Sequence, residues 1–153
     1  NQRGITYFGL FGPYLAGAKK IVVEDAYVRK PYQLRNLAEF LEMLLRCKNP
    51  DEDIAVHLVT GHNEPGFVEA QLDGLNELAS TFSQLGVNLT YEFRDTLHDR
   101  SITADTGWEI LLGRGLDIFQ KFVDGVWLNP LLRHQQLRRV KECKITYRRI
   151  DEK

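Results

Sequence analysis

The segment from Leu97 to Gln120 contains the residues whose types and spacing could act on a phosphate group. His98, Arg100 and Asp105 follow one another at intervals of two and five positions. An imidazole can attack phosphorus or move a proton, and a guanidinium binds phosphate oxygens through two parallel hydrogen bonds. A second guanidinium, Arg114, stands between the flexible residues Gly113 and Gly115. These residue types predict a site for a phosphate group.

The pattern around these residues predicts a β-hairpin that would position them. On a strand, His98 and Arg100 would point to the same face, because side chains alternate with a period of two. Asp105 to Gly107 is a turn signal, and Trp108 to Leu112 has the pattern of a return strand. The hairpin would then lead directly into Gly113 and Arg114.

The rest of the chain alternates strand and helix patterns. Long helices between short apolar strands predict a largely parallel sheet with helices on its faces, and the hairpin adds antiparallel strands. The fold class is therefore predicted as α/β, with a mixed, mostly parallel sheet flanked by helices. The expected elements are a helix from about Phe8, a strand at Ile21–Val23, a helix at Pro31–Cys47, a strand at Ile54–Thr60, a helix at Phe67–Leu85 and strands at Val87–Phe93 and Lys144–Ile150.

The segment that follows the first strand is a second candidate for a site. It runs from Glu24 to Arg29 and includes Tyr27, and α/β folds place ligands beyond the carboxyl ends of buried strands. Arg35 lies near the amino end of the next helix, close to the same strand end. The alternative is a strand that becomes amphipathic at a sheet edge. His57, within an apolar run, is interpreted as a sheet histidine and not as a ligand.

Composition restricts the class of protein. A chain of 153 residues with 43% hydrophobic residues suits a single domain with a real core. The net charge of −1 gives no global basic signature, so any anion site must be a local patch. The two cysteines match no zinc spacing and suggest reduced thiols in a cytoplasmic protein without cofactor or metal. No apolar run approaches the ~18 residues of a membrane span.

The candidate motif resembles that of the phospholipase D superfamily, H-x-K-x4-D followed six residues later by G-S-x-N. His98, Arg100 and Asp105 stand at this spacing, with arginine in the lysine position. The longer pattern around Trp108 and residues 113–117, with residues 5–7, 10–12, 23–29 and 33–36, is similar to the phospholipase D-like domain of the MIT C-terminal type. Domains of this type follow MIT domains in a eukaryotic abscission protein and are appended to prokaryotic Lon-like AAA+ ATPases.

The resemblance covers nearly the whole chain and implies a phospholipase D-like layered fold. Residues 1–153 would then form one domain, and a chain that starts at Asn1 suggests excision from a larger parent protein. Phospholipase D chemistry needs two histidines, one to attack phosphorus and one to protonate the leaving oxygen. One motif supplies half of such a site, so an active enzyme would pair two copies of His98 across a dimer axis.

The sequence also departs from the catalytic pattern. Residues 113–117, Gly-Arg-Gly-Leu-Asp, stand where G-S-x-N is expected, and they offer neither serine nor asparagine. Seven residues, not six, separate Asp105 from Gly113. The departures remove groups that active members use on the phosphoryl oxygens and leave a cationic surface.

The first hypothesis is therefore a non-catalytic anion-binding and dimerisation module. The resemblance implies phosphoinositide-bearing membranes, a peripheral location at them, and a homodimer. The expected phosphate contacts are Arg29, Arg35, His98, Arg100 and Arg114, with Tyr27 and Trp108 lining the pocket.

Two other functions remain open. One is a DNA-binding or subunit-contact domain of a Lon-like ATPase. The other is a dimeric phosphodiesterase or nuclease with His98 as nucleophile, assisted by Arg100 and Asp105. In a purely structural interpretation, His98 and Arg100 are a solvated edge pair, Asp105 serves only the turn, and Trp108 is a packed sheet residue.

Overall fold

Three helices and six strands alternate along the part of the chain that the structure describes. The computed structural model describes residues 6–113, 116 and 144–150. The elements are α1 (Tyr7–Leu15), β1 (Lys20–Glu24), α2 (Pro31–Cys47), β2 (Ile54–Thr60), α3 (Val68–Ser83), β3 (Val87–Phe93), β4 (Ser101–Ala104), β5 (Trp108–Leu112) and β6 (Ile145–Arg149).

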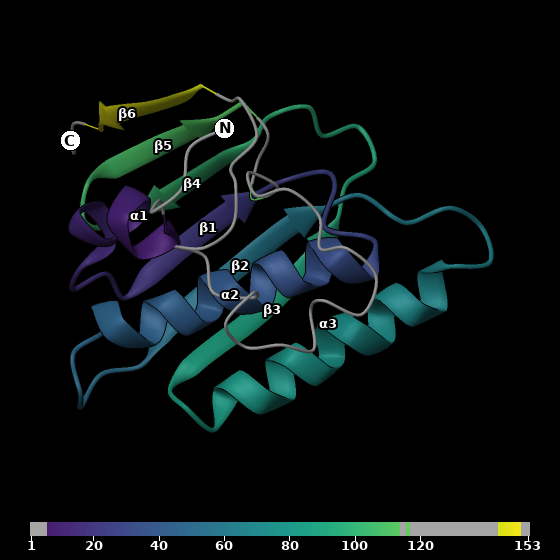
Figure 1. The fold of residues 1–153 in the computed structure, drawn as a ribbon, viewed down its shortest axis with the longest axis horizontal. Coiled ribbons are helices and arrows are strands. Elements are labelled where there is room, and N and C mark those ends of the chain that lie inside the picture. Colours follow the sequence, from purple (N-terminus) through teal and green to yellow (C-terminus); the bar gives the residue numbers. More distant parts are fainter. Residues whose placement is uncertain (1–5, 114–115, 117–143, 151–153) are drawn as a thin grey trace.

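The strands form one mixed sheet in the order β3-β2-β1-β4-β5-β6, drawn in Figure 1. The predicted α/β class and mixed sheet are confirmed. The balance differs from the expectation of a mostly parallel sheet, since β1, β2 and β3 are joined by two parallel pairings, whereas β4, β5 and β6 add three antiparallel ones. The difference arises because the hairpin pairs with β1, and β6 then extends the hairpin, so the sheet has a parallel half and an antiparallel half.

All three helices lie on the same face of the sheet (Figure 1). The strands alternate accordingly, because Ile21 and Val23 of β1 are buried beneath the helices while Val22 is exposed on the other face. The sequence analysis expected helices on the faces of the sheet. Among the described residues the helices cover one face only.

The longest helix, α2, explains how the sequence forms this layer. Pro31 occupies the first helical position, where its missing N–H costs nothing. The leucine stripe turns inward, with Leu37, Leu41 and Leu44 fully buried. Cys47 is a free thiol at the end of the stripe, and burial raises its pKa. Cys143 lies outside the described residues.

An aromatic cluster joins α1 to α2. The ring of Phe40 lies 6.2 Å from Tyr7 and 6.2 Å from Phe11, edge-on to both, and all three residues are fully buried. The helices are thereby fixed to each other as well as to the sheet. Among the described residues, no helix is both long enough and apolar enough to cross a membrane.

Truncation of Phe40 should test this core. Phe40→Ala removes a fully buried ring, and we expect a loss of about 3–5 kcal/mol in the free energy of unfolding. The matched control is Phe67→Ala, because Phe67 is 59% exposed and its removal should change stability by no more than about 0.5 kcal/mol. Urea unfolding followed by circular dichroism measures both. Equal losses in the two variants would contradict the described packing.

Candidate anion site

The candidate site lies at one edge of the sheet, where the chain changes direction between its two halves. Strands β1, β2 and β3 end at this edge, and the antiparallel strand β4 begins there. The chain leaves β1 towards β2 on one side, whereas β4 occupies the other side. Ligands of open α/β sheets bind at such a switch point, beyond the carboxyl ends of the strands.

Asp25 organises the loop that follows β1. Its side chain is almost fully buried and accepts two backbone hydrogen bonds, from Tyr27 at 3.0 Å and from Leu116 at 2.9 Å. The hydroxyl of Tyr7 donates to the carbonyl of the same Leu116. A buried carboxylate is tolerated when backbone N–H groups satisfy it. Asp25 thus ties the loop after β1 to the chain that follows β5.

Tyr27, Arg29 and Arg100 form the cationic centre of the site. The guanidinium carbon of Arg29 lies 4.9 Å from the centroid of the Tyr27 ring, and that of Arg100 lies 4.8 Å from it. Both cations thus interact with one electron-rich ring, which is 46% exposed. Arg29 is also held by a hydrogen bond from Nε to the carbonyl of Ala26 at 2.7 Å. The structure therefore brings these three predicted residues together.

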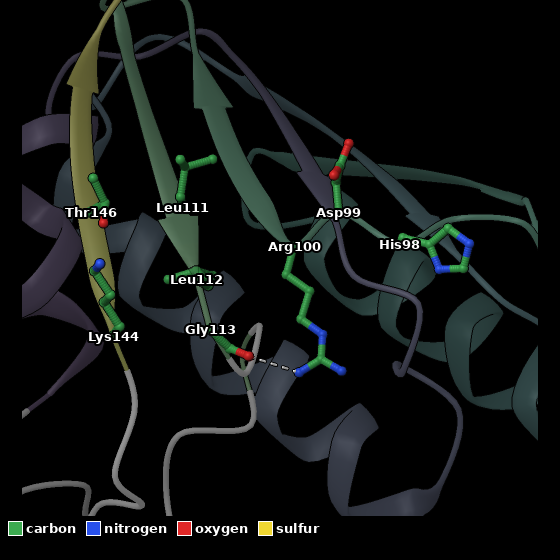
Figure 2. A pocket seen from close by; sticks show the side chains of 8 residues that line it. All are labelled: His98, Asp99, Arg100, Leu111, Leu112, Gly113, Lys144 and Thr146. Carbon is green, nitrogen blue, oxygen red and sulfur yellow. Dashed lines mark hydrogen bonds between the residues drawn. The ribbon is translucent and has the colours of Figure 1, made fainter.

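Arg100 connects this centre to an open groove on its other side. Its Nη1 donates to the carbonyl of Gly113 at 3.1 Å, as Figure 2 shows. The groove has a volume of about 560 Å³. Its described lining combines charged, apolar and backbone groups from the chain before β4, from β5 and from the beginning of β6, namely His98, Asp99, Arg100, Leu111, Leu112, Gly113, Lys144 and Thr146. Tyr27 does not line the groove among these residues, but it contacts Arg100, which does.

His98 does not share the direction of Arg100, contrary to the expectation from strand alternation. Figure 2 shows the imidazole turned away from the guanidinium, towards the β1 side of the sheet. The reason is that β4 begins only at Ser101, so residues 97–100 do not alternate as a strand would. The connection from β3 is anchored instead by Leu97, which is buried in a small cluster with Ala26 and Val59. His98 is exposed and lines the groove from one side.

Asp105 lies at the far end of the hairpin from Arg100. The two are five positions apart along extended chain, which corresponds to about 16 Å at ~3.3 Å per residue. The Oδ1 of Asp105 accepts the backbone N–H of Lys19 at 3.0 Å, beside the turn that Gly107 closes with a φ of 93°. Asp105 thus fastens the turn to the chain that enters β1. This agrees with the alternative in which Asp105 serves the turn and not a phosphate site.

Trp108 is also separated from the cationic centre. It begins β5 at the turn, where its ring meets Tyr14 edge-on at 4.8 Å and the Arg149 guanidinium at 5.5 Å. The expectation that it lines a pocket with Tyr27 is therefore not met. Arg35 lies partly buried on α2, after the helix has begun, and Arg114 lies outside the described residues.

Gln71 is a residue of this region that sequence reasoning missed. It is buried on α3, where its Nε2 donates to the carbonyls of Val28 at 3.0 Å and Gly61 at 2.9 Å, and its Oε1 accepts the N–H of Asn63 at 2.8 Å. One amide thereby joins the loops after β1 and β2. The signal in the sequence was a glutamine at an inward position of an apolar helix stripe, four residues before Leu75.

The face of the sheet away from the helices carries a polar network. His57 contacts the Thr90 hydroxyl at 2.7 Å and Glu92 at 2.8 Å, which confirms it as a sheet histidine. Arg94 lies 3.2 Å from Glu92 and 3.7 Å from Glu24. The hydrogen bond from His57 is the main reason that the pKa of Glu92 lies below its usual range. Within the described part of the chain, no three His, Cys, Asp or Glu residues gather to hold a metal ion.

Comparison with known proteins identifies the type of domain. Residues 4–149 match the family model described as a phospholipase D-like domain at the C-terminus of MIT. The chain is also similar to MIT domain-containing protein 1 of Mus musculus, with 37% identity over 122 residues. The match covers 79% of this chain and 48% of the mouse protein, so the chain spans about half the length of that relative.

The contact between His57 and Glu92 predicts how the stability of the fold depends on pH in the acid range. The pKa of Glu92 is lower in the folded than in the unfolded chain, so the stability contribution of this glutamate is fully present above its ordinary pKa and is lost as the pH falls through the lower pKa of the folded protein. In His57→Ala the pKa of Glu92 should rise towards its ordinary value. Carboxyl-detected NMR titration of both proteins measures this change. An unchanged Glu92 midpoint would show that His57 is not the cause.

Proposed function

Because the chain belongs to the family of phospholipase D-like domains found at the C-terminus of MIT, we propose that it is a non-catalytic accessory module of a larger protein that binds a phosphoinositide headgroup. The module would lie peripherally on the cytoplasmic surface of a membrane, where anionic lipids attract basic side chains. Its binding residues are Tyr27, Arg29 and Arg100, with Lys144 and His98 at the adjoining groove.

The observation that carries the proposal is the stacking of Arg29 and Arg100 on the single ring of Tyr27. Two positive charges that contact one ring repel each other, and a multivalent anion bound beside the ring would relieve that repulsion. The ring holds both guanidiniums in place without neutralising them. A phosphate therefore suits this site better than a neutral ligand does.

The positions of the motif residues support a non-catalytic role. His98 is turned away from Arg100, and Asp105 serves the turn at the opposite end of β4. Nucleophilic attack on phosphorus needs the imidazole, the phosphoryl oxygens and their cationic partners within hydrogen-bond reach of one another.

We further propose that the module acts as a homodimer. Each copy contributes the cationic centre formed by Tyr27, Arg29 and Arg100. In a dimer, binding of one centre to a membrane would hold the second centre close to the same membrane, so the dimer would bind more tightly than a single copy. Sedimentation or light scattering of the purified domain would test the dimer independently of lipid.

Lipid binding should depend on Arg100. We expect wild-type protein to bind phosphatidylcholine vesicles that contain phosphatidylinositol bisphosphate, and Arg100→Gln to bind them at least about tenfold more weakly, because a lost charge-assisted contact is worth roughly 1.4 kcal/mol or more. The control is Arg148→Gln, since Arg148 is an exposed arginine on β6 paired with Glu109. It should bind like the wild type in a flotation assay.

The same flotation assay distinguishes a lipid-binding site from a nucleic-acid-binding site. Competing duplex DNA should leave vesicle binding intact. Displacement by DNA, with an affinity that falls steeply with salt, would instead favour the nucleic-acid interpretation of the arginines. Equal weakening by both arginine substitutions would indicate diffuse charge attraction and contradict a defined site.

Phosphodiesterase activity should be absent. We expect the dimeric or monomeric protein at high concentration to release no nitrophenolate from bis-p-nitrophenyl phosphate, because the one motif does not assemble its histidine, arginine and aspartate at one place. Turnover that disappears in His98→Ala would overturn the non-catalytic assignment and identify His98 as a nucleophile.

A further inference from the structure

We propose that His62, held in place by Asp95, is an additional anion-binding residue of the same site and makes anion binding dependent on protonation. This inference rests on the proposed function, since it assumes that Arg29 and Arg100 receive a phosphate-type anion. It adds a residue that lies outside the phospholipase D-like motif and comes from the loop that follows β2.

His62 is held rigidly at the end of β2. Its backbone N–H donates to Oδ1 of Asp95 at 2.7 Å, and its ring Nδ1 lies 2.9 Å from Oδ2 of the same carboxylate. The ring also stacks on Phe93, with centroids 4.1 Å apart and planes inclined by 19°. Two contacts to one carboxylate and one aromatic neighbour fix the ring, although its side chain is 43% exposed. A merely solvated loop histidine would have no such support.

The residue before His62 lies against the cationic centre. A Cβ on Gly61 would come within 2.5 Å of Nη2 of Arg29 and within 3.1 Å of the Ala26 carbonyl, so Gly61 lies directly against the Arg29 side chain. Asn63, on the other side of His62, donates from its side chain to the carbonyl of Arg29 at 3.2 Å. The loop that carries His62 is therefore packed along the loop that carries Arg29.

The contact with Asp95 decides what the ring can do. A carboxylate next to Nδ1 selects the tautomer with the proton on Nδ1, which leaves Nε2 of the neutral ring as an acceptor that repels phosphate oxygens. Protonation turns Nε2 into a donor. Among the described residues, no hydrogen bond engages Nε2, so the imidazolium can offer this N–H to an anion. Anion binding at His62 therefore takes up a proton.

The charges around His62 are consistent with this role. The pKa of Asp95 lies below its usual range, first because of the backbone N–H of His62, then because of its ring, with a smaller effect of the Arg29 charge, so the carboxylate remains available to hold an imidazolium. Arg94 is paired with Glu92 and Glu24. Glu64, on the same loop, is exposed and its backbone N–H is bound to the Asn63 side chain.

Inorganic sulfate is the probe, because it does not titrate where histidine does, between about pH 5 and 8. We follow the His62 and His57 ring protons by NMR across this range at constant ionic strength, with sulfate or with chloride. Sulfate should raise the His62 midpoint and leave that of His57 unchanged, since His57 already contacts Thr90 and Glu92 through its two ring nitrogens. Because sulfate binding and protonation of His62 favour each other, sulfate affinity should fall by about fivefold or more from the acid to the alkaline end of this pH range.

Two variants locate the effect. His62→Gln should abolish the pH dependence of sulfate affinity while Arg29 and Arg100 retain weaker binding at all pH values. Asp95→Asn should weaken sulfate binding at acid pH, because the amide no longer holds the His62 ring through two carboxylate contacts. A His62 midpoint that ignores sulfate, or a pH dependence that survives in His62→Gln, would overturn the role of His62.

The two proposals fail in different ways. If sulfate shifts the resonances of Tyr27 and Arg100 but not those of His62, the anion site stands and only the role of His62 is wrong. If sulfate shifts none of these resonances and vesicle binding is insensitive to Arg100→Gln, the anion site itself is wrong, and His62 has no site to serve.

Discussion

The buried carboxylate of Asp25 is the interaction on which the candidate site depends. It binds the backbone of Tyr27 on one side and that of Leu116 on the other, and so joins the parallel half of the sheet to the chain that leaves the antiparallel half. A charge in this position is stable only while both N–H groups remain in place, because an unpaired buried carboxylate is costly. The loop that presents Tyr27 and Arg29 is therefore held from within the protein.

The arrangement of the sheet explains why cations from distant parts of the chain meet. Parallel strands bring their carboxyl ends to one edge, and an antiparallel neighbour begins at that same edge. The loop after β1 and the start of β4 are consequently adjacent, although Arg29 and Arg100 are far apart in the sequence. The aromatic ring of Tyr27 stabilises both cations at this junction.

A motif that is continuous in sequence is divided in space for a similar reason. An extended strand carries its two ends apart, so Arg100 and Asp105 serve opposite ends of β4, one at the groove and the other at the turn. His98 precedes the strand and follows Leu97, whose burial against Ala26 and Val59 directs the crossing connection. One short motif thus contributes to two separate places, the groove at Arg100 and the turn at Asp105.

Most of the helices and strands, and the family, could be predicted from the residues alone. The patterns for α2, β2, β3 and β5 predicted their bounds as the structure has them, because apolar periodicity and turn residues act over a few neighbouring positions. Tyr27, Arg29 and Arg100 were also predicted as site residues. The tertiary structure was needed to show that these three meet, that Trp108 and Asp105 lie elsewhere, and that Asp25 and Gln71 hold the neighbouring loops. Such contacts depend on strand order and on the path of connecting loops, which residue spacing does not encode.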